Sequence, residues 1–176
     1  MNKGIRIDEN SPFFDTKNLF FKEFPSDYRQ VRFFGLLMIQ KSPASIRDVN
    51  LLEQQVTELL KNAIKHGNKR DVSKKIKVWH GYTENSAHLI IEDEGEGFKN
   101  LEEWNEFYQK RQGFLEAGDF EKLIDYASFR NLDSDFEDGG NALFAALEYW
   151  NEGVVFNAKR NKVAVKRKFK RRIIGD

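Results

Sequence analysis

The stretch "KKIKVWHGYTENSAHLIIEDEGEGF", residues 74–98, decides the fold class. Apolar and polar residues alternate through Ile76, Val78 and His80, as they do in a half-buried strand. Residues 86–98 form a second strand that runs into a glycine-rich loop, and Glu84-Asn85 fits the turn between the two strands. Strands joined by so short a turn are antiparallel. The stretch therefore predicts a β-hairpin that ends in a flexible loop.

The rest of the chain adds helices and a second hairpin. The spacing of apolar residues predicts a strand at 18–24, helices at 26–42, 49–67, about 100–112, 119–130 and 141–150, and strands at 153–158 and 162–169. Strands with helices segregated to one face make a two-layer sandwich. We therefore expect an α/β (α+β) fold with a mixed, mainly antiparallel sheet and helices on one face.

Length and composition indicate a single domain. The 176 residues show no internal repeat, and we expect an N-terminal lead-in at 1–18, one domain at 19–169 and a basic tail at 170–176. The chain has no Cys, which removes disulfides and thiolate zinc sites and favours a cytoplasmic protein. The longest apolar run, 33–39, is too short to span a bilayer, so no membrane association is expected.

The net charge of +1 is unevenly distributed along the chain. Residues 99–138 contain 5 basic and 11 acidic residues, whereas residues 159–172 contain 9 basic residues and no acidic one. A basic end fits a solvated final strand or a nucleic-acid contact. The strand end is favoured, because the segment lacks the interleaved aromatic residues typical of single-strand binders.

Two polar motifs suggest a ligand site. In "ELLKNAIKHGN", residues 58–68, Glu58 and Asn62 lie four apart and share one helix face. Asp93 follows a buried strand, where its carboxylate can accept a hydrogen bond from an exocyclic amine. Gly95 and Gly97 would let the backbone approach a ligand closely. Each motif alone also fits a solvent-facing helix or an ordinary turn.

A third glycine-rich motif precedes the last helix. Gly139 and Gly140 open that helix, whose free N–H groups and positive dipole end suit an anion. None of the three motifs is specific alone. The presence of all three in this order, each in the expected structural setting, is the specific signal.

Together the motifs resemble those of the GHKL superfamily, which shares the Bergerat ATP-binding fold of gyrase, heat-shock chaperones, sensor histidine kinases and mismatch-repair ATPases. Glu58-x-x-x-Asn62-Ala63 resembles its N box, with Lys65 where many histidine kinases carry a Lys, and residues 93–98 and 139–143 resemble its two glycine boxes. The resemblance implies ATP and magnesium as cofactors. It also implies that Asn62 holds the metal, Lys65 contacts phosphate, Asp93 reads the adenine amine and Glu58 polarises the attacking group.

The chain most closely resembles the anti-sigma-factor serine/threonine kinases of bacterial partner-switching systems. The resemblance covers residues 19–98 and 138–169, including "FPSDYRQVR" and the block that begins "GGNALFAALEYW". It implies a kinase that phosphorylates an anti-sigma antagonist and binds a sigma factor, and it allows a homodimer.

The chain departs from this family in three places. Ala142 replaces an expected Gly, no Thr lies near Ala164, and the segment 99–138 is much longer than a typical ATP lid. The first two favour an alternative, a catalytically weak or inactive nucleotide-dependent interaction module, whereas Glu58 favours the kinase. We expect residues 99–138 to form two helices over the nucleotide mouth as a partner-docking lid, or else a constitutively packed decoration.

Overall fold

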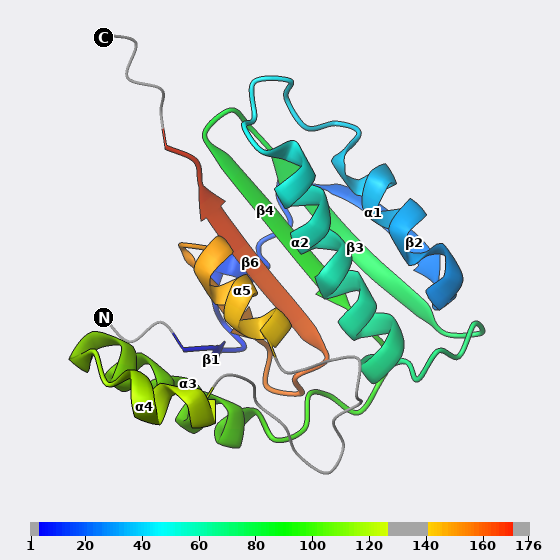
Figure 1. The fold of residues 1–176 in the computed structure, drawn as a ribbon. Coiled ribbons are helices and arrows are strands. Elements are labelled where there is room, and N and C mark those ends of the chain that lie inside the picture. The colour runs from blue at the N-terminus through cyan, green and yellow to red at the C-terminus, as the bar shows by residue number, and fades with distance from the viewer. Residues whose placement is uncertain (1–3, 127–140, 171–176) are drawn as a thin grey trace, which may run out of the picture.

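The computed structural model describes residues 4–126 and 141–170, which build a six-stranded mixed sheet (Figure 1). The strands are β1 (Arg6–Ile7), β2 (Phe20–Pro25), β3 (Lys75–Tyr82), β4 (Ser86–Glu92), β5 (Gly153–Phe156) and β6 (Lys162–Lys168). Their order across the sheet is β1-β5-β6-β4-β3-β2. Only the β1–β5 pair is parallel. A mixed, mainly antiparallel sheet is thus confirmed.

Three helices cover one face of this sheet: α1 (Val31–Ile39), α2 (Val49–Asn62) and α5 (Asn141–Tyr149) (Figure 1). On α2, Leu52, Val56 and Leu60 are fully buried, because their four-residue spacing places them on one helix face. A short 3₁₀ turn, Tyr28–Gln30, leads into α1. Within the described ranges no helix is long and apolar enough to cross a bilayer.

The hairpin predicted for residues 74–92 is present. β3 and β4 pair from Lys77↔Glu92 to Tyr82↔Ala87, and the N–H of Thr83 donates to the carbonyl of Ser86 at 2.8 Å across the turn. The second hairpin joins β5 to β6. β3 shows the apolar alternation of a half-buried strand, whereas β5 and β6 contain runs of three consecutive buried apolar residues, Val154–Phe156 and Val163–Val165.

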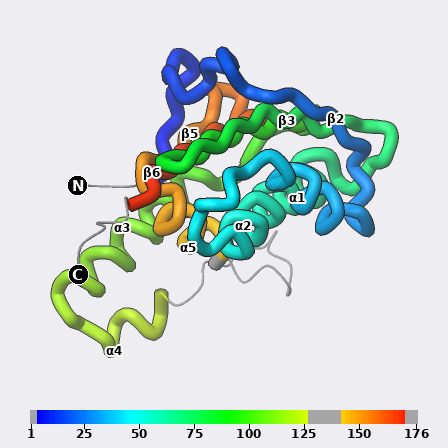
Figure 2. Tube along the Cα trace, turned by 90° about the horizontal axis from the view of Figure 1, so that it is seen from above, coloured from blue at the N-terminus to red at the C-terminus, as the bar shows by residue number. Residues whose placement is uncertain are grey.

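The N-terminal segment is not a loose lead-in, and that expectation is wrong. β1 pairs with β5, and Ile5 is buried at 5% exposure. Figure 2 shows the segment before β2 crossing the sheet face opposite the helices. There the ring Nε2 of His88 lies 2.7 Å from the carbonyl oxygen of Phe13. This cover keeps Ile90 and Ala164 fully buried, although neither belongs to the helix-side core.

The segment after β4 forms α3 (Leu101–Ala117), α4 (Phe120–Leu123) and a 3₁₀ turn, Ile124–Tyr126. Trp104 is buried, and its ring centroid lies 5.1 Å from that of Phe144 on α5. The side-chain amide of Asn105 bonds both the N–H and the carbonyl of Ile5 at 2.9 Å, which fixes α3 beside β1. Phe120 is 69% exposed rather than packed. The remainder of 99–138 lies outside the described residues.

Candidate functional site

The helix α2 ends in a π-helical turn, Ala63–Gly67. The N–H of Asn68 donates to the carbonyl of Ala63 at 2.9 Å, a step of five residues instead of four. Lys65 is half-buried and His66 is exposed on this turn. Single π turns of this kind are rare and are found frequently at functional sites. The turn carries the chain from α2 to the segment that precedes β3.

Gly67 lies directly against Asp93. A Cβ at Gly67 would sit 2.3 Å from the carboxyl carbon of Asp93, and a Cβ at Gly95 would sit 2.2 Å from the carbonyl oxygen of Gly67. Figure 1 shows α2 and β4 finishing at the same end of the sheet. The structure therefore brings the motif at 58–68 into contact with the motif at 93–98.

This contact gives a direct test of the site. Gly67→Ala is expected to lower the free energy of unfolding by about 1–3 kcal/mol, because the added methyl overlaps the Asp93 carboxylate. The matched control is Gly113→Ala on α3, where an added Cβ meets nothing within 4 Å. It is expected to stabilise the protein by about 0.5–1 kcal/mol. Urea unfolding measures both; equal stability of the Gly67 variant and wild type would contradict the contact.

The carboxylate of Asp93 is partly desolvated. Burial raises its pKa from 3.8 to about 6, against the opposing effect of the Gly95 N–H, which donates to Oδ1 at 2.8 Å. Among the described residues, this is the one hydrogen bond that the carboxylate accepts. A desolvated acid with remaining acceptor capacity is a candidate for ligand binding.

The glycine loop is held by the chain itself. Gly97 has φ +102°, and a Cβ there would lie 2.0 Å from the carbonyl oxygen of Lys159 in the β5–β6 turn. The N–H of Phe98 donates to the carbonyl of Arg160 at 2.8 Å, and the amide of Asn161 donates to the carbonyl of Asp93 at 2.8 Å. Close packing against the protein's own backbone thus requires these glycines. The sequence motif alone instead predicts that they allow a ligand to approach the backbone.

Asn68 is a residue of this site that the sequence motifs do not identify. It is fully buried, and its Oδ1 accepts from the N–H of Glu94 at 2.7 Å. Its Nδ2 donates to Ser26 Oγ at 2.8 Å and to the carbonyl of Lys75 at 3.0 Å. Asn68 therefore ties the loop after β4 to the end of α2 and the start of β3. An Asn after a helix-ending Gly is a common stop signal, so nothing in the sequence distinguishes this role.

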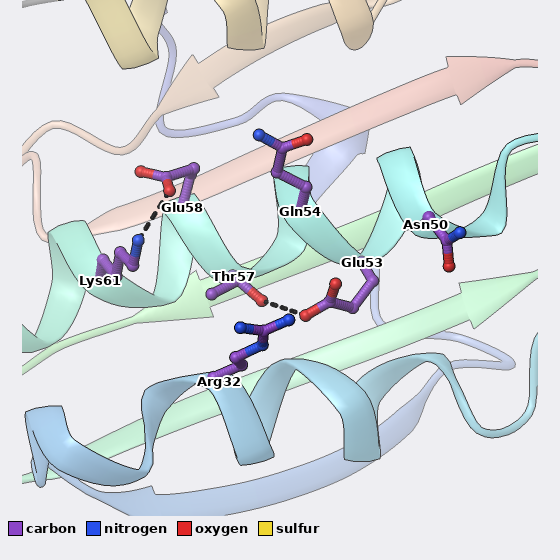
Figure 3. A pocket seen from close by; sticks show the side chains of 7 residues that line it. All are labelled: Arg32, Asn50, Glu53, Gln54, Thr57, Glu58 and Lys61. Atoms are coloured by element: carbon purple, nitrogen blue, oxygen red, sulfur yellow. Dashed lines mark hydrogen bonds and ion pairs between the residues drawn. The ribbon is translucent and has the colours of Figure 1, made fainter.

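Glu58 and Asn62 lie farther back on α2. Lys61 Nζ pairs with Glu58 at 2.8 Å. Figure 3 shows Glu58 pointing away from α1, at the rim of an open groove of about 370 Å³ between α1 and α2. Gly67 follows Glu58 by nine positions, about 13 Å along a helix. No hydrogen bond or ion pair in the described part of the chain joins Glu58 to the Asp93 loop, and Asn62 is half-buried.

The third predicted element is described only from α5 onward. Gly139 and Gly140 lie outside the described residues. α5 begins toward the end of the sheet where α2 and β4 finish (Figure 1). Ala164 on β6 pairs with Ile90 and lies on the face opposite the helices, so its side chain does not face the α2 side.

The protein offers few metal ligands at Asn62. Where residues are described, no three His, Asp or Glu side chains gather in a group that could hold a metal. A magnesium ion at Asn62 would therefore take one amide oxygen from the protein and the rest from phosphate and water. Magnesium commonly binds in this way beside nucleotides.

Comparison of the sequence with protein-family models and with curated proteins gives no match. Function is therefore inferred from the motifs and from the geometry of the site.

Proposed function

We propose that the protein is an ATP- and magnesium-binding serine/threonine kinase of the anti-sigma type, built on a Bergerat fold. It phosphorylates an anti-sigma antagonist and binds a sigma factor or a similar partner. The observation that carries the proposal is the contact of Gly67 with Asp93 and Gly95. It joins the two motifs that the family resemblance assigns to one nucleotide site.

Each residue has a specific task in this proposal. The free oxygen of Asp93 accepts a hydrogen bond from the exocyclic amine of adenine, and its desolvation favours that bond over water. Asn62 holds magnesium, while Lys65, Gly139 and Gly140 bind the phosphates. Bound ATP supplies the phosphoryl group. Positioning and charge neutralisation account for most of the catalysis in such transfers.

Glu58 acts as the general base. It accepts the proton of a Ser or Thr hydroxyl while that oxygen forms a bond to phosphorus and the bond to the leaving oxygen breaks. The ion pair with Lys61 must open for this step, which requires a side-chain rotation of either half-buried residue.

A second candidate is a nucleotide-dependent interaction module without kinase activity. The Glu58–Lys61 pair favours it, because the pair must open before Glu58 could reach a substrate hydroxyl. The replacement of the expected Gly by Ala142 favours it as well.

The segment 99–138 is proposed to dock a partner. α3 is fixed by Trp104 and Asn105, which also fits a packed decoration. However, Phe120 on α4 and Ile124 on the 3₁₀ turn after it are 69% and 73% exposed, next to acidic residues. Apolar side chains left so exposed on an ordered element suit an interface.

The deciding experiment combines binding with transfer. Titration calorimetry with ATP and magnesium is expected to show binding, with GTP as the control nucleotide. Labelled ATP is then incubated with the protein and with the proteins encoded beside its gene, and phosphate is expected on a Ser or Thr of one of them. Binding without transfer would support the interaction module. Absence of adenine-nucleotide binding would exclude both candidates.

A further inference from the structure

The two edges of the sheet differ in whether other groups bond to their outward backbone atoms. At β1, which has only two residues, the side chain of Asn105 bonds the N–H and carbonyl of the adjoining Ile5. At the opposite edge, β2 has six residues and pairs only with β3 among the described strands. Exposed strand edges are sites of association unless they are blocked. One edge is thus capped and the other is open.

The backbone groups that β2 offers can be identified. The N–H of Ser26 donates to the carbonyl of Lys74 at 3.1 Å, just beyond the end of the ladder. Bonded and non-bonded pairs alternate in an antiparallel ladder, so every second residue back to Phe20 bonds to β3. Phe21 and Glu23 then direct their N–H and carbonyl groups outward.

Two further observations agree with this assignment. Pro25, which has no N–H, falls at an outward position, where an edge strand tolerates it. Lys75, its partner in the register, bonds to Glu94 and Asn68 instead of to β2. The outward groups of Phe21 and Glu23 are therefore available to another strand.

Apolar side chains flank this edge on both faces. Phe20 and Phe21, on opposite faces of β2, are 50% and 52% exposed. α1 lies over β2, since Phe34 stacks on Phe24 with ring centroids 4.4 Å apart. It also carries Phe33, which is 56% exposed. An edge with apolar residues above and below suits strand addition, in which main-chain bonds give affinity and side-chain contacts give selectivity.

The charge around the edge indicates the partner. The segments beside the edge carry four basic residues (Lys17, Lys22, Arg29 and Lys41) against two acidic ones (Glu23 and Asp27), a local charge of +2, and Lys41 Nζ lies 3.8 Å from the ring centroid of Phe20. A second copy would place this charge against itself, which disfavours self-association. We propose that β2 takes up an extended acidic segment of another protein as a further strand of the sheet. This proposal does not depend on the nucleotide site.

The test uses a synthetic peptide of about ten residues in which Val and Ile alternate with Glu and Asp. Fluorescence anisotropy is expected to show binding to wild type and at least about tenfold weaker binding to Glu23→Pro, which removes an outward N–H without touching the bonds to β3. Glu23→Ala is the matched control, which loses the same charge but keeps the N–H, and it is expected to bind at least as tightly as wild type. A peptide with Lys in place of Glu and Asp is expected to bind at least about tenfold more weakly.

Hydrogen exchange of wild type provides a second measurement, which holds even if the Pro variant proves unfolded by thermal melting. Saturating acidic peptide is expected to slow exchange at the Phe21 and Glu23 amides. The proposal is overturned if the acidic peptide does not bind, if it binds the Lys-substituted form equally well, or if these amides are unaffected. A dimer in ultracentrifugation that dissociates in Glu23→Pro would overturn it too, because it would assign the edge to a second copy.

Discussion

Replacing Glu58 with Ala is expected to leave ATP binding unchanged and to lower phosphoryl transfer by about 10²–10⁴-fold. The reason is geometric: Glu58 lies about 13 Å along the helix from Gly67 and pairs with Lys61, so its loss does not disturb the Asp93 contact. A base acts on the attacking hydroxyl and not on the bound nucleotide. Single-turnover transfer and calorimetry on the same preparation separate the two effects.

Two further variants serve as controls. Lys61→Ala releases Glu58 from its ion pair and is expected to retain transfer, because the base remains. Asn62→Ala is expected to weaken magnesium-dependent ATP binding directly. Normal turnover by Glu58→Ala on a proven substrate would remove the assigned role. Loss of ATP binding in that variant would instead mark Glu58 as a binding residue.

The sheet and its helices were predictable because their signals are local. Ile76 and Val78 alternate with polar neighbours, and Leu52, Val56 and Leu60 recur at helical spacing, so each element shows its buried face within a few residues. The two hairpins then follow from the short turns. This accounts for the fold class and for the positions of the main elements.

The N-terminal cover was not predictable by the same means. β1 has two residues, and its partner β5 is at the far end of the chain. No periodicity can appear in so short a strand, and the contact between Phe13 and His88 depends on the completed sheet. Ile90 and Ala164 show the consequence, since both are buried on a face that the sequence pattern leaves open.

The candidate site was predictable in composition but not in construction. The spacing of Glu58, Asn62 and Asp93 suggested a ligand site, yet nothing local shows that α2 ends in a π turn or that Gly67 touches Asp93. The buried bonds of Asn68 are equally non-local. Such contacts exist only once the end of α2 and the loop after β4 are folded together.

Replacing Asp93 with Asn is expected to weaken adenine-nucleotide binding by about 10–100-fold, because a charged acceptor is lost from a partly buried hydrogen bond. The pH dependence gives a sharper criterion. With a pKa of about 6, wild type loses the ionised acceptor as pH falls below 6, and its affinity falls with it. The ratio of wild-type to variant affinity is therefore expected to shrink between pH 8 and pH 5. The phosphate groups of the nucleotide titrate in the same way with both proteins, so their effect on affinity cancels in this ratio.

The same substitution is expected to stabilise the unliganded protein. A raised pKa means that the folded state favours protonated Asp93, so this contribution to stability is present below pH 3.8 and is lost as pH rises through 6. Asn keeps an oxygen for the Gly95 N–H and carries no charge to desolvate. At pH 8 the variant should gain about 1–2 kcal/mol after allowance for solvent screening. The gain should vanish near pH 4. A variant that bound nucleotide normally and gained no stability would show that Asp93 is an ordinary loop acid. Loss of affinity together with gain of stability would show that the fold tolerates a desolvated charge at the position where the ligand needs it.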